Sequence, residues 1–324
     1  MKVLENNEKP IVIVVVGPTA SGKTSLGIKI AKEVNGEIIS ADSMQIYKGL
    51  DVGTAKATEE EKKEAKHHLL DICNIKDKFS VADYKKKCYE KIDEILNQGK
   101  TPVIVGGTGL YVNAVLNNMN FDNEETLEEV EKKKLYRESL EKLLAEKGKE
   151  YLYNMLKDLD PEAAQNIHMN NTKRVIRAIE LANEGIYKGN VEKRNDLWNK
   201  NDSKYDFVTV YINMPREILY DRINRRVDAM EDSGIIEEAK MLKSMNLDKN
   251  STALQAIGYK EFFEYLDGKE TLQEALEKLK QNTRRYAKRQ ITWFNKLNCD
   301  LVLNEKTDEK EIIDKLKRKV YGEK

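Results

Sequence analysis

The feature that most constrains this chain is a glycine-rich segment that directly follows a short apolar run. Ile11–Val16 is entirely apolar and mostly β-branched, as expected of a buried strand, and residues 25–34 then have the apolar spacing of a helix. Between them the chain fits the pattern G-x-x-x-x-G-K-[ST] with Gly17, Pro18, Thr19, Ala20, Ser21, Gly22, Lys23 and Thr24. In that context the pattern predicts a phosphate-binding loop, because its backbone N–H groups and the start of the helix face anionic oxygens. Lys23 adds positive charge and Thr24 offers a hydroxyl to Mg²⁺, so we expect a diphosphate or triphosphate site, with a plain strand-to-helix turn as the structural alternative.

Further strand-like segments place this loop in an α/β protein. They are Ile38-Ile39, which leads to Asp42, and then Pro102–Val105, Phe207–Ile212 and Leu301–Leu303. Because helical segments alternate with them, the sequence predicts a P-loop NTPase-like parallel sheet flanked by helices. From 119 to 202 the strand signal disappears and charged residues at helical spacing predominate. This predicts a helical insertion domain (119–202) within a core domain (1–118 and 203–324).

The composition limits the class of protein. The 56 Lys and Arg residues balance 56 Asp and Glu residues, and the longest apolar run is far shorter than the ~20 residues of a membrane-spanning helix. The three cysteines are widely spaced and the three histidines lack metal-binding spacing, which argues against a disulfide framework or a structural zinc site. We therefore expect a cytoplasmic protein that does not contact a membrane.

Two polar residues are expected beside the phosphate-binding loop. Asp42 follows the second strand, and the run Gly106–Tyr111 follows the third and contains Thr108. Ligands of open α/β sheets bind at the carboxyl ends of the strands, so both residues should share an edge with the loop. Asp42 is then either a helix N-cap or a magnesium-water acceptor or, more specifically, a general base.

Arg222 and Arg226 are one helical turn apart and can project from the same face. Such pairs usually lie on a solvated helix face. Here the alternative is an arginine clamp on phosphate, which the planar guanidinium group suits.

Charge is unevenly distributed along this neutral chain. From Lys278 to Lys296 seven residues are basic and none is acidic. Arg285 and Arg289 form one stripe of a predicted helix there, and Lys173–Arg177 is a second basic patch. Two separate patches suggest contact with the phosphate backbone of RNA or DNA, with a solvated surface as the alternative.

Eight segments together carry a resemblance to a known family. In order along residues 11–296 they are Gly17–Thr24, Ile38–Tyr47, Gly49–Lys56, His68–Asp71, Gly106–Tyr111, Arg222–Met230, Ala256–Glu261 and Ala287–Phe294. The first pattern alone is shared by many unrelated proteins, whereas the set is specific. The chain resembles the tRNA dimethylallyltransferase family, whose members are also called tRNA isopentenyltransferases.

The resemblance implies transfer of a dimethylallyl group from dimethylallyl diphosphate to N6 of adenine 37, in tRNAs that read codons beginning with U. It implies that the loop holds the diphosphate with Mg²⁺ on Thr24, while Arg226 and Arg222 stabilise the leaving group. Asp42 is the implied general base, because the exocyclic amine is a poor nucleophile and must lose a proton. The adenine must first leave the stack of the anticodon loop, which costs a few kcal/mol.

The resemblance also implies where tRNA binds. The insertion domain would grip the anticodon stem, and Thr108 would lie close to the flipped base as part of the catalytic set. The expected contact residues are Asp42, Ser43, Met44, Gln45, Lys173, Arg174, Val175, Ile176, Arg177, Gln255, Ala256, Ile257, Gly258, Tyr259 and Lys260, together with Arg285 and Arg289.

The segment before Lys173 departs from the family pattern. His168–Thr172 reads His-Met-Asn-Asn-Thr where the family usually has His-Pro-Asn-Asp-Pro, so the turn before Lys173 is less defined.

Two other functions fit part of the sequence. A small-molecule or nucleotide kinase would use the same loop and a nearby Asp. A nucleotide-gated RNA-binding switch would bind tRNA without changing it. We expect a monomer in each case.

Overall fold

The computed structural model describes residues 9–119, 127–185, 203–248 and 251–322. Contacts divide the chain into two compact units, Met1–Met119 with Lys200–Lys324 and Asn120–Asn199. They are called the core unit and the insertion unit below. Parts of the predicted insertion, 120–126 and 186–202, lie outside the described residues.

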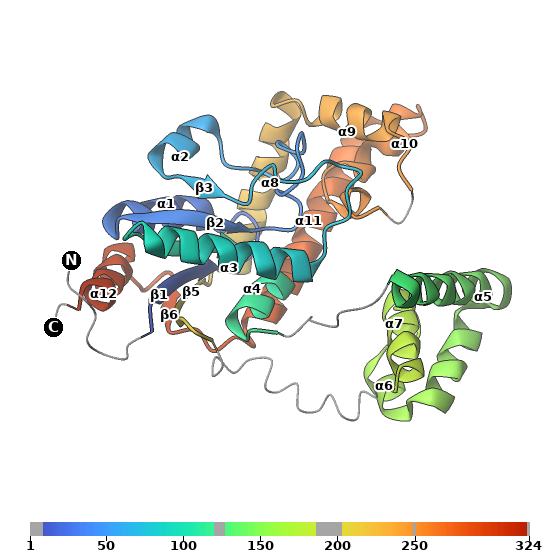
Figure 1. The fold of residues 1–324 in the computed structure, drawn as a ribbon. Helices are drawn as coiled ribbons and strands as arrows, with labels where there is room; N and C mark the ends of the chain where they lie inside the picture. The colour runs from blue at the N-terminus through green and yellow to red at the C-terminus, as the bar shows by residue number, and fades with distance from the viewer. Residues whose placement is uncertain (1–8, 120–126, 186–202, 249–250, 323–324) are drawn as a thin grey trace. The chain divides into compact units, whose positions relative to one another are not determined.

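The core unit is built on a parallel sheet of six strands in the order β3-β2-β4-β1-β5-β6, shown in Figure 1. The strands are β1 (Ile11–Val16), β2 (Gly36–Ala41), β3 (His67–His68), β4 (Thr101–Gly106), β5 (Asp206–Ile212) and β6 (Leu301–Leu303). This confirms the predicted α/β fold and every predicted strand. The two-residue edge strand β3 was not predicted, because it is too short to show any periodicity.

Helices cover both faces of the sheet. In the core unit they are α1 (Lys23–Glu33), α2 (Glu59–Glu64), α3 (Val81–Asn97), α4 (Gly109–Leu116), α8 (Arg216–Asp232), α9 (Ile235–Ser244), α10 (Phe263–Leu266), α11 (Leu272–Phe294) and α12 (Glu309–Tyr321), with 3₁₀ turns at Ala253–Gln255 and Lys260–Phe262. Apolar residues of α1 and α12 share one buried cluster with β1, β4 and β5. Right-handed crossovers put α3, which leads from β3 to β4, on the opposite face, and Figure 1 shows α1 and α3 on opposite sides of the strands.

The strand register brings three chain segments to one edge of the sheet. Val16 and Ala41, the last residues of β1 and β2, both pair with Gly106 at the end of β4. The segments that follow, 17–24, 42–45 and 107–108, therefore leave the sheet at the same level. This alignment is what makes a shared site possible.

A second buried cluster fixes the chain beyond β2. Ile46, Tyr47 and Leu50 are fully buried against α8, α9, α11 and the segment around Tyr259 and Phe262. Burying a large apolar side chain contributes about 1.5–3 kcal/mol. The loop that follows residue 50 therefore begins at a residue that is fixed in this buried cluster.

The insertion unit is helical where the structure describes it. It contains α5 (Leu127–Leu159), whose helical geometry is interrupted at Gly148, α6 (Pro161–Asn166) and α7 (Thr172–Asn183). Leu140, Leu152 and Leu156 pack with Val175, Ile176 and Ile179 in its core. Along the ranges that the structure describes, no helix of either unit combines the length and apolar character needed to cross a membrane.

Candidate active site

The loop between β1 and α1 presents backbone donors. Gly22 has φ of 93°, a left-handed conformation that favours glycine, and it starts α1 without a side-chain cap. The N–H groups of the first helical turn are thus left for another acceptor, and the helix dipole makes that acceptor preferably an anion. The Ser21 hydroxyl is buried and has no hydrogen-bond partner among the described residues. These features suit bound phosphate oxygens.

A cavity of about 770 Å³ lies beside this loop, and Lys23, Arg222 and Arg226 are among the cations that line it. Lys23 Nζ donates to the Pro18 carbonyl oxygen at 2.6 Å, and Arg226 Nη1 donates to Thr19 Oγ1 at 3.1 Å. Arg222, which also lines the cavity, is an exposed residue. Lys23 is partly exposed as a residue, but its ammonium group is enclosed. This burial lowers the pKa of Lys23 to about 7. The negative charge of Asp42 opposes the shift, and the positive charge of Arg226 adds to it. A bound anion would raise the pKa of Lys23 again, because it favours the charged ammonium.

Gln290 of α11, which we did not predict, joins two of the loops. Its Oε1 accepts from the Thr19 N–H at 2.8 Å, and its Nε2 donates to the Gly107 carbonyl at 2.9 Å. A Cβ at Gly107 would come within 2.3 Å of this amide, so the glycine run permits the close approach of α11. Nothing in the sequence distinguishes Gln290 from the other amide residues of α11, such as Gln281 and Asn282.

One carboxylate oxygen of Asp42 is hydrogen-bonded to the backbone, and the other is available to a ligand. Its Oδ1 accepts from the N–H groups of Met44 at 2.9 Å and Gln45 at 3.4 Å. Residues 43–46 form a turn and not a helix, so Asp42 caps a turn where the sequence suggested a helix N-cap. Its Oδ2 accepts no hydrogen bond from the described residues and can serve a ligand. The roles of magnesium-water acceptor and general base are therefore compatible with the geometry.

Thr108 lies against the same turn, as the strand register requires. Its Oγ1 accepts from the Ser43 N–H at 3.0 Å and donates to Ser43 Oγ at 3.3 Å. The hydroxyl of Tyr286, on α11, interacts with Thr108 and Gln290; burial, and secondarily the charge of Asp42, raises the pKa of Tyr286. Tyr286 is a further site residue that the sequence did not single out.

A second cavity, of about 330 Å³, adjoins the first. Residues that line both are Thr19, Asp42, Thr54, Arg226, Met230 and Tyr286. The second cavity is lined further by Ser43, Met44, Gln255, Ala256, Ile257, Lys260 and Arg289. Asp42 thus borders both the cavity beside the phosphate-binding loop and a second cavity, many of whose lining residues were expected to contact nucleic acid.

Other expected contact residues lie elsewhere or point inward. Arg285 is exposed and donates to Asn282 Oδ1 at 3.4 Å, outside both cavities. Gly258 and Tyr259 are buried. In the insertion unit Lys173, Arg174 and Arg177 are exposed on α7, whereas the side chains of Val175 and Ile176 are buried in the core of the unit.

The residues fit a magnesium ion only when it is shared with a ligand. Within the described residues no three His, Cys, Asp or Glu side chains form a group that could hold a metal ion. Thr24 lines the first cavity beside the loop N–H groups. Mg²⁺ is commonly bound by one or two side chains together with phosphate oxygens and water, and Thr24 with a bound diphosphate supplies that donor set.

The chain is similar to known proteins over nearly its whole length. The family described as "IPP transferase" matches residues 45–297. A tRNA dimethylallyltransferase of Acetivibrio thermocellus is 49% identical over 308 residues, which cover 94% of this chain and 96% of the relative. The tRNA dimethylallyltransferase of Bacillus subtilis is 48% identical over 289 residues, or 89% of each chain.

Solved structures give the same result. A tRNA isopentenylpyrophosphate transferase from Staphylococcus epidermidis has a TM-score of 0.67 and 41% identity, covering 98% of this chain and 100% of that one. A eukaryotic dimethylallyltransferase acting on tRNA has a TM-score of 0.76 and 27% identity, covering 97% of this chain and 80% of that one.

Proposed function

The chain belongs to the IPP transferase family, and from that premise we propose that it transfers a dimethylallyl group from dimethylallyl diphosphate to N6 of adenine 37 in tRNAs that read codons beginning with U. The observation that carries the proposal is the position of Asp42, which borders both the first cavity, beside the phosphate-binding loop, and the adjoining second cavity. A donor in the first cavity and an extruded base in the second would meet at this carboxylate. The relatives are named as prenyltransferases of tRNA, which supports this function over the kinase alternative.

The first cavity suits the leaving group. As the allylic carbon–oxygen bond breaks, the diphosphate gains negative charge. Loop N–H groups, Lys23, Arg226 and Arg222 are placed around the same space, and preorganised donors of this kind stabilise developing charge. When Mg²⁺ is bound, held by Thr24, it supplies further charge neutralisation at the diphosphate.

Asp42 accepts the proton that the reaction releases. The N6 amine attacks the allylic carbon, a carbon–nitrogen bond forms, and diphosphate leaves with the electrons of the broken bond. The amine proton passes to Asp42 Oδ2, while Oδ1 stays engaged with the turn at Met44. Tyr286 and Thr108 border the same point and orient the base.

The second cavity suits an RNA loop. Lys260 and Arg289 are exposed residues at its edge, and the Arg289 guanidinium lies 5.6 Å from the centre of the Tyr286 ring. Cations at a cavity edge neutralise phosphates and help hold a flipped nucleotide. The exposed Lys173, Arg174 and Arg177 of α7 make the insertion unit a second tRNA-binding surface, for the anticodon stem.

Mass spectrometry of tRNA tests the proposal. Purified protein is incubated with Mg²⁺, dimethylallyl diphosphate and a tRNA that reads codons beginning with U, beside the same tRNA carrying guanosine at position 37. We expect a gain of one five-carbon unit on the first tRNA alone. An unchanged tRNA mass would contradict the proposal. Conversion of ATP to ADP in a parallel incubation would then indicate a kinase, and binding of unmodified tRNA would indicate a binding switch.

A further inference from the structure

The segment 51–56 forms a wall of both cavities in the core unit. Val52, Thr54, Ala55 and Lys56 line the first cavity, and Gly53 and Thr54 line the second. None of these residues was given a role in the chemistry above. They nevertheless line the same cavity as the phosphate-binding loop.

The wall is held in one tight conformation. Ala55 has φ of 46°, a left-handed value that a non-glycine residue adopts only when its surroundings enforce it. The carbonyl oxygens of Thr54 and Ala55 accept from Gln45 Nε2 at 3.2 and 3.1 Å. A Cβ at Gly53 would come within 2.6 Å of the Tyr259 ring, so the backbone rests directly on that side chain.

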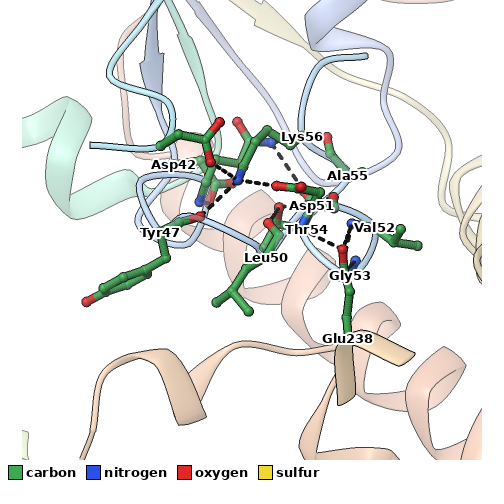
Figure 2. Close-up of polar contacts among 12 residues, drawn as sticks. Asp42, Tyr47, Leu50, Asp51, Val52, Gly53, Thr54, Ala55, Lys56 and Glu238 are labelled. Atoms are coloured by element: carbon green, nitrogen blue, oxygen red, sulfur yellow. Dashed lines mark hydrogen bonds and ion pairs between the residues drawn. The ribbon is translucent and has the colours of Figure 1, made fainter. Parts of the chain in front are cut away.

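A buried lysine anchors the end of the wall. The Lys56 side chain is 2% exposed, and its Nζ donates to the Tyr47 carbonyl oxygen at 2.9 Å and to Asp71 Oδ1 at 2.6 Å. It also pairs with Asp51. Figure 2 shows this ammonium enclosed between Asp51 and the backbone at Tyr47.

Glu238 of α9 anchors the beginning of the wall from the other side. Its carboxylate accepts the N–H groups of three successive residues, Asp51 at 3.0 Å, Val52 at 2.9 Å and Gly53 at 3.2 Å, as Figure 2 shows for the last two. It also accepts from the Tyr259 hydroxyl at 3.0 Å. Hydrogen bonds to a charged acceptor are stronger than neutral ones, and three of them converge here on one turn.

We propose that Glu238 is a positioning residue for prenyl transfer: it holds the 51–56 wall at the distance from the phosphate-binding loop that the donor requires. This rests on the proposed function. Glu238 itself lines neither cavity, so it acts through the wall and not on the substrate. Its removal frees three backbone N–H groups and lets the strained turn at Ala55 relax.

The donor should be affected more than the tRNA. Small displacements of groups that position a substrate cost up to about a hundredfold in rate constant. We expect Glu238→Ala to lower kcat/KM for dimethylallyl diphosphate by about tenfold to a hundredfold, mainly through KM. Glu238→Gln should fall between Ala and wild type, because the amide keeps one acceptor oxygen but turns an NH₂ group toward backbone N–H donors.

The matched control is Glu237→Ala. Glu237 is the preceding residue of α9, is exposed, and makes a surface ion pair with Lys240 at 3.7 Å. Amide hydrogen exchange over residues 49–56 reports the wall directly, calorimetry with inorganic diphosphate reports the first cavity, and steady-state kinetics with varied donor reports transfer.

The proposal predicts faster exchange at 51–53, weaker diphosphate binding and a raised donor KM in Glu238→Ala, with partial recovery in Glu238→Gln and wild-type values in Glu237→Ala. Faster exchange with unchanged diphosphate affinity and donor KM would reduce Glu238 to a structural contact, and unchanged exchange would remove it as an anchor. A wild-type protein without transfer would refute the proposed function, while exchange and diphosphate binding would still decide whether Glu238 positions the wall.

Discussion

Gln290 and Thr19 are 271 residues apart, yet the Gln290 side chain accepts the Thr19 backbone N–H at 2.8 Å. The same amide donates to Gly107 at 2.9 Å, so α11 joins the segments that follow β1 and β4. One buried side chain therefore sets the spacing between the phosphate-binding loop and the edge that carries Thr108.

Removing this amide should loosen the loop. In Gln290→Ala the Thr19 N–H and the Gly107 carbonyl lose their partner, and an unsatisfied buried group costs about 1–3 kcal/mol. We expect a lower free energy of unfolding by that amount and weaker binding of inorganic diphosphate. Urea unfolding and calorimetry measure both, and exposed Gln281→Ala on the same helix is the control. Equal diphosphate affinity in the two variants would contradict the bridging role.

Diphosphate binding should depend on pH through Lys23. Its pKa of about 7 without ligand means that the ammonium is charged below pH 7 and increasingly neutral above it. A bound anion favours the charged form, so above about pH 7 binding requires proton uptake and loses up to tenfold in affinity per pH unit.

Diphosphate itself titrates over this pH range, but it does so equally with wild type and with Lys23→Met. Its titration therefore cancels in the ratio of the two affinities. We expect the ratio of wild-type to variant affinity to be largest below pH 7 and to fall as the pH rises toward 9. Calorimetry in buffers of different ionisation enthalpy should detect the proton taken up. A ratio that stays constant over this range would show that Lys23 does not titrate there.

The two arginines of α8 should differ in effect. Arg226 is enclosed, and burial lowers its pKa, whereas Arg222 is exposed. A charge-assisted contact away from water contributes about 1.5–3 kcal/mol, so Arg226→Ala should weaken diphosphate binding by about tenfold to a hundredfold and Arg222→Ala by less. Binding of tRNA should change little in both. A loss of tRNA affinity with diphosphate affinity intact would place Arg226 on the RNA.

The basic stripe of α11 should contribute to the salt dependence of tRNA binding. Each phosphate contact adds about 0.7–0.9 to the slope of log Kobs against log salt concentration. Arg289→Ala and Arg285→Ala should each lower that slope, and exposed Arg225→Ala, whose guanidinium pairs with Asp221, should not. Filter binding over a salt series measures the slope. An unchanged slope for Arg285→Ala would mean that this side chain faces solvent.

The parts of the structure that sequence could predict are those with local signals. Ile11–Val16 and the other long strands have continuous apolar runs, and the phosphate-binding loop has fixed spacing between strand and helix. Asp42 and Thr108 could be placed at one edge because parallel strands end together. These predictions need only the neighbours of each residue along the chain.

The remainder depends on contacts between distant segments. Gln290, Tyr286 and Glu238 stand in ordinary helical sequence, and their roles appear only when α11 and α9 pack near the strand ends. Val175 and Ile176 show the reverse effect, since they fall within a basic motif but their apolar side chains are buried in the insertion unit. A motif identifies a segment, and packing decides which of its side chains reach a ligand.

Prenyl transfer by Asp42→Asn under single-turnover conditions tests the central claim most directly, which is that this carboxylate takes the proton of N6. Asparagine keeps an acceptor for the Met44 N–H, so the turn should persist while the base is lost. We predict tRNA and diphosphate affinities within a few-fold of wild type and a transfer rate lower by about 10²–10⁴. A transfer rate equal to that of the wild type would contradict the account.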